Sequence, residues 1–186
     1  MIHDTKLGLI REAIEEYLTV ARQCILTDKG NGGCFGYPAA LLLFCCIDAI
    51  GAYHRTRHGY TVKVDGVDKT LDASKPSTYF YILNDPIFGL SLSGAQISTL
   101  YSNYRSMLAH NASMKEGGFL SIDSPNDQPF QWSVNTTTQQ MISMVCLKPL
   151  LNLVSSTVLK FIEENGDKIE SSVTAKGISI SGRSTT

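Results

Sequence analysis

Nine consecutive apolar residues, from Ala39 to Ile47, constrain the fold of this chain more than any other part of its sequence. A bilayer span needs about 20 apolar residues, and Asp48 ends this run, so the sequence predicts no membrane span. A helix that is apolar on every side is covered by other elements over most of its surface. We therefore expect a helix from Pro38 to about Arg57, at the centre of the fold or at a subunit interface.

The spacing of the remaining apolar residues predicts two further helices. Between residues 7 and 25 they recur every three or four positions, which is typical of a helix that buries one face. Thr5, or the residue before it, could cap the start of that helix. The same spacing predicts a helix that starts near Ser91 or Ser93 and stops soon after His110.

Residues 58–92 lie between the second and third predicted helices and are too many for a structureless loop inside a compact domain. The segment 61–64 alternates like a short strand, turn chemistry follows at 65–66, and 77–84 could form a short helix. The aromatic residues at 79–81 could stack on nucleic-acid bases, although anchoring to the core is the favoured alternative. We therefore predict a structured insertion.

A β hairpin is predicted next, because 119–123 and 129–134 flank a polar turn at 124–128. A fourth helix should begin near Asn135, where a Thr three residues before a Gln could make a capping box. It should run to residues 165–166 and be kinked or divided by its internal proline.

These elements together predict an all-α fold, a four-helix up-down bundle with the hairpin between the third and fourth helices and the insertion between the second and third. The bundle would occupy residues 1–166, followed by a loosely held Ser/Thr/Gly-rich tail at 167–186. Sixteen Lys and Arg against 17 Asp and Glu give a net charge of −1. That charge excludes a protein that grips nucleic acid by bulk electrostatics, so any RNA contact must be local.

Cysteine and glycine usage excludes several kinds of site. Five cysteines without a CxxC pair argue against a disulfide framework or a zinc site, and we expect reduced thiols in a cytoplasmic protein. Cys45 and Cys46 are interpreted as small core residues. The glycine-rich run at 30–36 matches neither the GxxxxGK[ST] nor the GxGxxG spacing of phosphate-binding loops, and it is interpreted as a connecting loop. The sequence predicts no cofactor.

The end of the third predicted helix carries the most specific pattern in the chain. Arg105 is followed by four residues and then His110, with Tyr104 before it and Asn111 after it. The preceding helix is strongly apolar with one acid, Asp48. This constellation resembles the signature of the HEPN superfamily.

That resemblance covers roughly residues 4–165 as architecture, and many members of the superfamily look like metal-independent endoribonucleases, often toxins or defence factors. It implies a homodimer whose site forms where the third helices of two subunits meet. It implies that His110 is the general acid or base acting on the ribose 2′-hydroxyl, that Arg105 holds the scissile phosphate, and that Asn111 orients the site. The position after the Arg is often Asn, Asp or His, and is Ser106 here. An antitoxin or other regulatory protein is a candidate partner.

Physical chemistry favours the same roles. Histidine has an unperturbed pKa of about 6.5, suited to proton transfer near neutral pH, and a guanidinium fork matches two phosphate oxygens. Five residues at about 100° each put Arg105 and His110 about 140° apart on one helix, a difficulty that a two-subunit cleft eases. The alternative is a surface arginine and a helix-capping histidine. Asp48 needs a partner, which is either Arg105 or His110, or a structural Tyr or Ser.

The densest basic cluster lies at the end of the second predicted helix. It could complement the negative end of that helix, or form part of an RNA track. Two of its histidines are four residues apart, but no third metal ligand is near in sequence, so no metal is predicted. A HEPN-like module that binds RNA, a nucleotide or a protein without catalysis is the alternative function. The cluster consists of His54, Arg55, Arg57 and His58.

Overall fold

The computed structural model describes residues 5–30, 32–54 and 59–171 of the chain. The helical elements are α1 (Lys6–Leu26), α2 (Gly36–His54), η1 (Pro76–Asn84), α3 (Gly94–Thr99), η2 (Leu100–Ser106), α4 (Met107–Asn111) and α5 (Leu147–Ser171). The strands are β1 (Thr61–Val64), β2 (Val67–Thr70), β3 (Gly118–Ser121), β4 (Phe130–Val134) and β5 (Met141–Cys146). Two sheets accompany the helices, so the fold is α+β and the expected all-α bundle is wrong.

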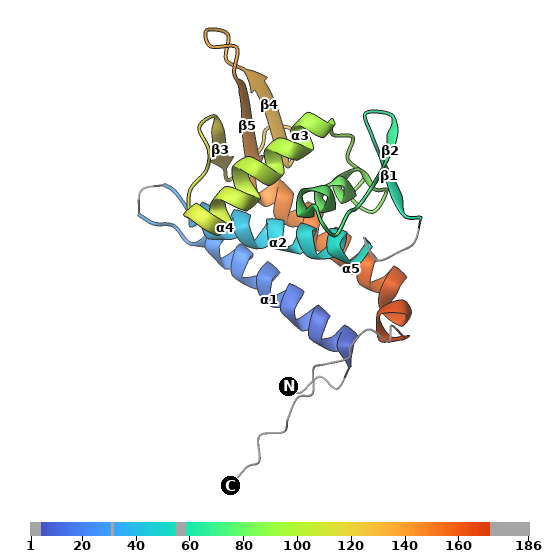
Figure 1. Ribbon diagram of the computed structural model, residues 1–186. Coiled ribbons are helices and arrows are strands. Elements are labelled where there is room, and N and C mark those ends of the chain that lie inside the picture. The colour runs from blue at the N-terminus through green and yellow to red at the C-terminus, as the bar shows by residue number, and fades with distance from the viewer. Residues whose placement is uncertain (1–4, 31, 55–58, 172–186) are drawn as a thin grey trace.

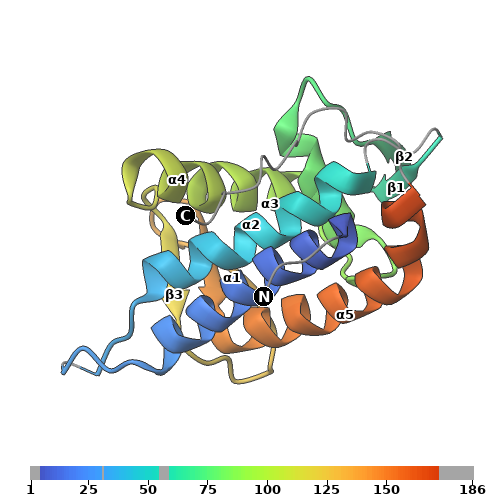
Figure 2. The same cartoon turned by 90° about the horizontal axis from the view of Figure 1, so that it is seen from below.

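The helices α1, α2 and the continuous α3–η2–α4 run side by side, with α5 packed against α1 and α2 (Figures 1 and 2). The three-stranded sheet lies at the end of the molecule where β5 runs directly into α5 (Figure 1). The β1–β2 hairpin projects at the opposite end of the helical layer. α1 confirms the predicted first helix, and the hydroxyl of Thr5 caps it by accepting from the backbone N–H of Gly8 at 3.0 Å.

α2 lies at the centre of the fold, as its composition predicts. Nine of its 19 residues are buried, and they contact α1, α5, η1 and η2. Among the described helices, α2 alone has the length and apolar composition of a membrane span, with 44% of that stretch buried inside the protein. A core helix of a soluble protein has the same properties, and the buried side of α2 fits that description.

Gly51 permits the closest approach between α2 and η1. A Cβ atom at this position would lie 2.3 Å from the carbonyl oxygen of Tyr79, which is backbone and cannot rotate away. We expect Gly51→Ala to lower the free energy of unfolding by about 1–3 kcal/mol, although alanine favours helix by about 1 kcal/mol. Urea denaturation measures the change. The exposed Ala49→Ser is the control, expected within about 0.5 kcal/mol of wild type. A free energy of unfolding for Gly51→Ala equal to that of wild type would contradict the close packing.

The third predicted helix is confirmed as the continuous segment from Gly94 to Asn111. Ser93 and Gln96 form a capping box at its start. The side chain of each residue accepts a hydrogen bond from the backbone N–H of the other. The helix ends where Ala112 adopts a left-handed conformation, with φ of 49°. Its central seven residues, η2, are wound as a π-helix.

The insertion between α2 and α3 is structured, as predicted. β1 and β2 pair antiparallel through a turn at Asp65 and Gly66, which both have positive φ. The Asp65 carboxylate accepts from the backbone N–H of Gly94 at 2.9 Å and so ties the hairpin to the start of α3. Tyr79 and Phe80 of η1 are 5% and 0% exposed. These two aromatic residues anchor the insertion to the core and are not available to bases.

The predicted hairpin between 119–123 and 129–134 is wrong, because β5 lies between β3 and β4. β3 pairs with β5 in parallel, and β4 pairs with β5 antiparallel. The actual hairpin is β4–β5, and its loop contains the predicted capping residues. There the side chain of Asn135 accepts from the backbone N–H groups of Thr137 and Thr138, which closes a turn instead of starting a helix.

The fourth predicted helix starts and ends later than its sequence signals indicate. α5 begins at Leu147, so Pro149 lies in the first turn, where no N–H is needed and no kink results. The helix continues through Gly166 to Ser171. A Cβ atom on Gly166 would lie 3.1 Å from the side chain of Leu7, so the glycine lets α1 pack closely on α5.

Candidate functional site

The helix that carries Arg105 and His110 changes its winding just before the motif ends. η2 is π-helical from Leu100 to Ser106, and α4 returns to α-helical geometry for its final five residues. π-helical turns are rare and occur frequently at functional sites. Arg105 therefore lies in the last turn of a π segment, and His110 lies in the last turn of α4.

Arg105 forms an ion pair with Asp48 of α2. Its Nε and Nη2 donate to the same carboxylate oxygen, Oδ2 of Asp48, at 3.0 and 2.6 Å. The side chains are only 25% and 15% exposed, so water screens this pair less than it screens a surface pair. The sequence left the partner of Asp48 open, and in the structure that partner is Arg105.

The other oxygen of Asp48, Oδ1, is buried and accepts no hydrogen bond from the described residues. Buried acceptors without a donor are uncommon in native proteins. Cys45, one turn earlier on α2, lies near both charges. Burial raises the pKa of its thiol, Arg105 lowers it and Asp48 raises it, so the thiol stays protonated at neutral pH. Burial also raises the pKa of Cys46 to about 12, as expected of a core residue.

Tyr104, next to Arg105, fastens the motif helix to the three-stranded sheet. Its ring is fully buried, and its hydroxyl lies where β3 and β5 meet. That hydroxyl accepts from the backbone N–H of Phe119 at 3.1 Å and donates to the carbonyl oxygen of Ser143 at 2.7 Å. The hydroxyl of Ser143 lies 3.0 Å away. This network fixes η2 relative to both strands.

Removal of that hydroxyl should therefore destabilise the protein. We expect Tyr104→Phe to lower the free energy of unfolding by about 1–3 kcal/mol, because it leaves buried groups of Ser143 without their partner. Tyr101→Phe, on a half-buried ring of the same segment, is the matched control and should change stability by less than about 0.5 kcal/mol. Urea denaturation compares the two. Equal stability of both variants would argue against the network.

The stability difference between wild type and Tyr104→Phe should depend on pH in the alkaline range. Burial raises the pKa of Tyr104 above its ordinary value of 10, although its hydrogen bonds to Ser143 and Phe119 partly oppose the rise. The contribution of the protonated phenol is present in full below pH 10 and is lost as the pH rises through the raised pKa. The stability gap between wild type and Tyr104→Phe should therefore narrow above pH 10.

His110 and Asn111 are exposed at the end of α4. Within the described part of the chain, no hydrogen bond or ion pair joins the side chain of His110 to another residue. The amide of Asn111 donates to the sulfur of Met107 at 3.2 Å and not to either motif residue. Ser106 is half-buried beside Arg105. The fold thus brings Asp48 and Arg105 together and leaves His110 on the surface.

The basic cluster is only partly described. His54 is 4% exposed and packs among the rings of Tyr53, Tyr60 and Phe161, so it belongs to the core and not to an RNA track. Arg55, Arg57 and His58 lie outside the described residues. No group of three His, Cys, Asp or Glu side chains that could hold a metal ion occurs in the described ranges. All five cysteines are free thiols.

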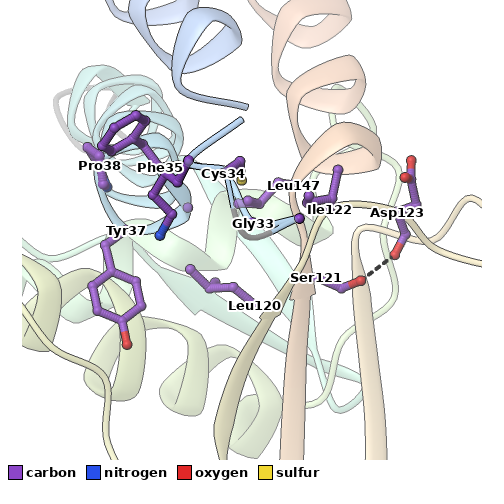
Figure 3. Close-up of a pocket in the computed structure, with 13 residues that line it drawn as sticks. Gly33, Cys34, Phe35, Tyr37, Pro38, Leu120, Ser121, Ile122, Asp123 and Leu147 are labelled. Atoms are coloured by element: carbon purple, nitrogen blue, oxygen red, sulfur yellow. Dashed lines mark hydrogen bonds between the residues drawn. The ribbon is translucent and has the colours of Figure 1, made fainter. Parts of the chain in front are cut away.

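A cavity of about 770 Å³ lies outside the motif, and neither Arg105 nor His110 lines it. Its walls come from the α1–α2 loop, the start of α2, the end of β3 and the start of α5 (Figure 3). Sequence reasoning interpreted this loop as a connection only. The signal that could have marked it is the pair Phe35 and Tyr37, two aromatic residues directly after a glycine-rich run. They are 45% and 48% exposed.

This chain matches no protein-family model, no curated protein and no solved structure. Its resemblance to the HEPN superfamily therefore depends on the motif from Arg105 to Asn111 and on the acid in the preceding helix.

Proposed function

We propose that this protein is a metal-independent endoribonuclease of the HEPN superfamily, in which Arg105 and His110 act on RNA. His110 takes the proton of a ribose 2′-hydroxyl, and the resulting oxygen attacks the adjacent phosphorus. The bond from phosphorus to the 5′-oxygen breaks, and that oxygen takes up a proton. The products are a 2′,3′-cyclic phosphate and a 5′-hydroxyl.

The ion pair between Asp48 and Arg105 carries this proposal. Two hydrogen bonds to one carboxylate oxygen fix the plane of the guanidinium and leave its second terminal nitrogen for a phosphate. A preorganised cation of this kind stabilises the charge that builds on a pentavalent phosphate. His110 lies five residues further along the same helix and is accessible to solvent.

A homodimer completes the site in this proposal. The two side chains point in different directions from one helix, since Arg105 is directed to α2 and His110 to solvent. A second subunit could place its own His110 opposite Arg105, as the resemblance implies. A toxin or defence role in the cytoplasm, with an antitoxin or regulatory partner, is part of the same proposal.

The deciding experiment is incubation of the purified protein with single-stranded RNA in excess chelator. We expect cleavage that chelation does not reduce, with 2′,3′-cyclic phosphate ends. Arg105→Gln should lose about 10²–10³-fold in rate, because it removes the charge on the phosphate. Arg22→Ala, which alters an exposed arginine on α1, is the matched control and should cleave as wild type does.

Loss of activity by Arg105→Gln could also come from unfolding, so the folded fraction of each variant is measured by circular dichroism. The double variant Asp48→Asn/Arg105→Gln replaces the ion pair by a neutral pair of similar shape. It should fold and still fail to cleave. Wild-type cleavage by either variant would contradict the proposal.

A non-catalytic module that binds RNA, a nucleotide or a protein is the second candidate. The observation that favours it is the same ion pair, because Asp48 neutralises the charge that Arg105 would offer a phosphate. That candidate predicts binding without turnover on any RNA tested. It also predicts that His110→Ala leaves binding unchanged.

A further inference from the structure

We propose that the cavity at the start of α2 binds one unstacked nucleotide of a single-stranded RNA whose scissile phosphate lies at Arg105 and His110. The inference rests on the proposed function and adds a recognition site to it. The cavity is separate from the motif, and its lining suits a base and a phosphate.

The cavity has the size of a ligand site, and part of its lining is held by backbone hydrogen bonds. Its volume of about 770 Å³ falls within the range of small-molecule sites, about 300–1,000 Å³. The α1–α2 loop that forms one wall is held by backbone hydrogen bonds from Lys29 to Gly33 at 2.9 Å and from Phe35 to Cys24 at 3.0 Å. Backbone groups held in this way lose less conformational freedom when a ligand binds.

The aromatic side of the cavity suits a nucleobase. Phe35 and Tyr37 lie on the side opposite Asp123 (Figure 3). Both residues are about half exposed, so their side chains are accessible to a ligand. Every base has a π-face, so stacking on such rings tolerates any RNA sequence.

The charge of the lining suits a phosphate. Lys29 and Asp123 are its charged side chains. Asp123 is paired with Lys148 at 2.9 Å, which offsets its negative charge. The ammonium group of Lys29 lies 5.8 Å from the centre of the Phe35 ring. A positive charge beside an aromatic ring matches the phosphate and base of one nucleotide.

The cavity lies in line with the motif. α2 runs antiparallel to the α3–η2–α4 helix (Figures 1 and 2), and Asp48 faces Arg105 across them. At 1.5 Å per residue, Tyr37 lies about 16 Å from Asp48 along α2. His110 lies about 7.5 Å from Arg105 in the same direction. The cavity therefore lies beyond Arg105 in the direction in which the motif helix ends, and an RNA strand that leaves Arg105 in that direction reaches it.

The wall formed by β3 is fixed to the motif helix as well. The hydroxyl of Tyr104, next to Arg105, binds the backbone of Phe119, and Leu120 of the same strand lines the cavity. The distance between the motif and the cavity is therefore set by the fold. A base inside a duplex cannot enter the cavity, so recognition requires a single strand.

The test is binding of a short fluorescein-labelled single-stranded RNA of mixed sequence, measured by fluorescence anisotropy in the uncleaving His110→Ala background. Tyr37→Ala should raise the dissociation constant about tenfold. Lys29→Gln should lower the slope of log K against log salt by about 0.7, the value for one lost phosphate contact on a single strand. Tyr17→Ala and Lys115→Gln, at exposed positions outside the cavity, are the matched controls and should bind as the background protein does.

The outcomes separate this inference from the proposed function. Background-like binding by both Tyr37→Ala and Lys29→Gln overturns the inference, even if the wild type cleaves RNA. Weakened binding by both variants with no cleavage by wild type overturns the proposed function and supports the cavity. No RNA binding by the wild type overturns both. Adenosine monophosphate that binds as tightly as the RNA overturns the inference, because the cavity would then be a free-nucleotide site.

Discussion

His110→Ala is expected to lower the rate of RNA cleavage by about 10²–10⁴-fold, which is the usual contribution of a general acid or base. The imidazole is exposed at the end of α4 and makes no hydrogen bond or ion pair with the described residues, so its removal should not unfold the protein. The loss should therefore appear in kcat, with RNA affinity changed little. Single-turnover cleavage and anisotropy measure the two quantities separately.

Lys115→Ala is the control for this variant, because it removes another exposed basic side chain a few residues away. It should keep wild-type kcat. A rate for His110→Ala within about threefold of wild type would show that the imidazole transfers no proton in the reaction. The proposed mechanism would then have no base, and the non-catalytic alternative would be favoured.

The ion pair predicts the second large effect, which is on stability. Arg105→Gln leaves the carboxylate of Asp48, only 15% exposed, without its cation, and one of its oxygens already accepts no hydrogen bond from the described residues. We expect a loss of about 1–3 kcal/mol in the free energy of unfolding. This range lies between the values for buried and exposed pairs, because both side chains keep some contact with water.

A double-mutant cycle isolates the interaction between the two charges. Asp48→Asn should cost less than Arg105→Gln, because the guanidinium is 25% exposed and can be hydrated. The loss in the free energy of unfolding of the double variant should be smaller than the sum of the two single losses. The difference, which is the coupling energy, should be about 1–2 kcal/mol. Arg11→Gln with Glu15→Gln, an exposed pair on α1, gives the control cycle. Its coupling should be below about 0.5 kcal/mol. Equal couplings would mean that the Asp48 pair behaves as a surface pair.

The helical half of the fold could be predicted because its apolar residues repeat with helical spacing. α1 and the helix from Gly94 to Asn111 follow from that period, and α2 follows from its unbroken apolar run. In the insertion, the strand at 61–64 and the turn at Asp65 and Gly66 could be predicted, whereas the second strand, β2, was not.

Strands near 119–123 and 129–134 could be predicted, but β5 and the pairing of the three strands could not, because several local sequence signals there are compatible with either a helix or a strand. Thr and Gln spaced as in a capping box also occur in the β4–β5 loop, where Asn135 closes a turn. Pro149 either kinks a helix or starts one, and only tertiary context decides between the two. The parallel pairing of β3 with β5 depends on contacts across the fold, among them those of Tyr104.

Part of the candidate site could also be predicted from the sequence, and part could not. The spacing of Arg105 and His110 is visible in the chain, and so is the single acid on α2. The choice of Arg105 as the partner of Asp48 needed the antiparallel arrangement of two helices. The cavity could not be found from spacing, because its walls come from segments near residues 29–38, 120–123 and 147.

The contact between Leu7 and Gly166 has a consequence for synthesis on the ribosome. α1 is synthesised well before α5, yet part of its buried face is covered by α5. At a translation rate of about 5–20 residues per second, α5 follows α1 after a time on the order of 10 s. During this interval α2 is the available cover for α1, and the apolar faces of both helices are open to other chains. Slow translation between α2 and α5 should therefore increase aggregation of this protein.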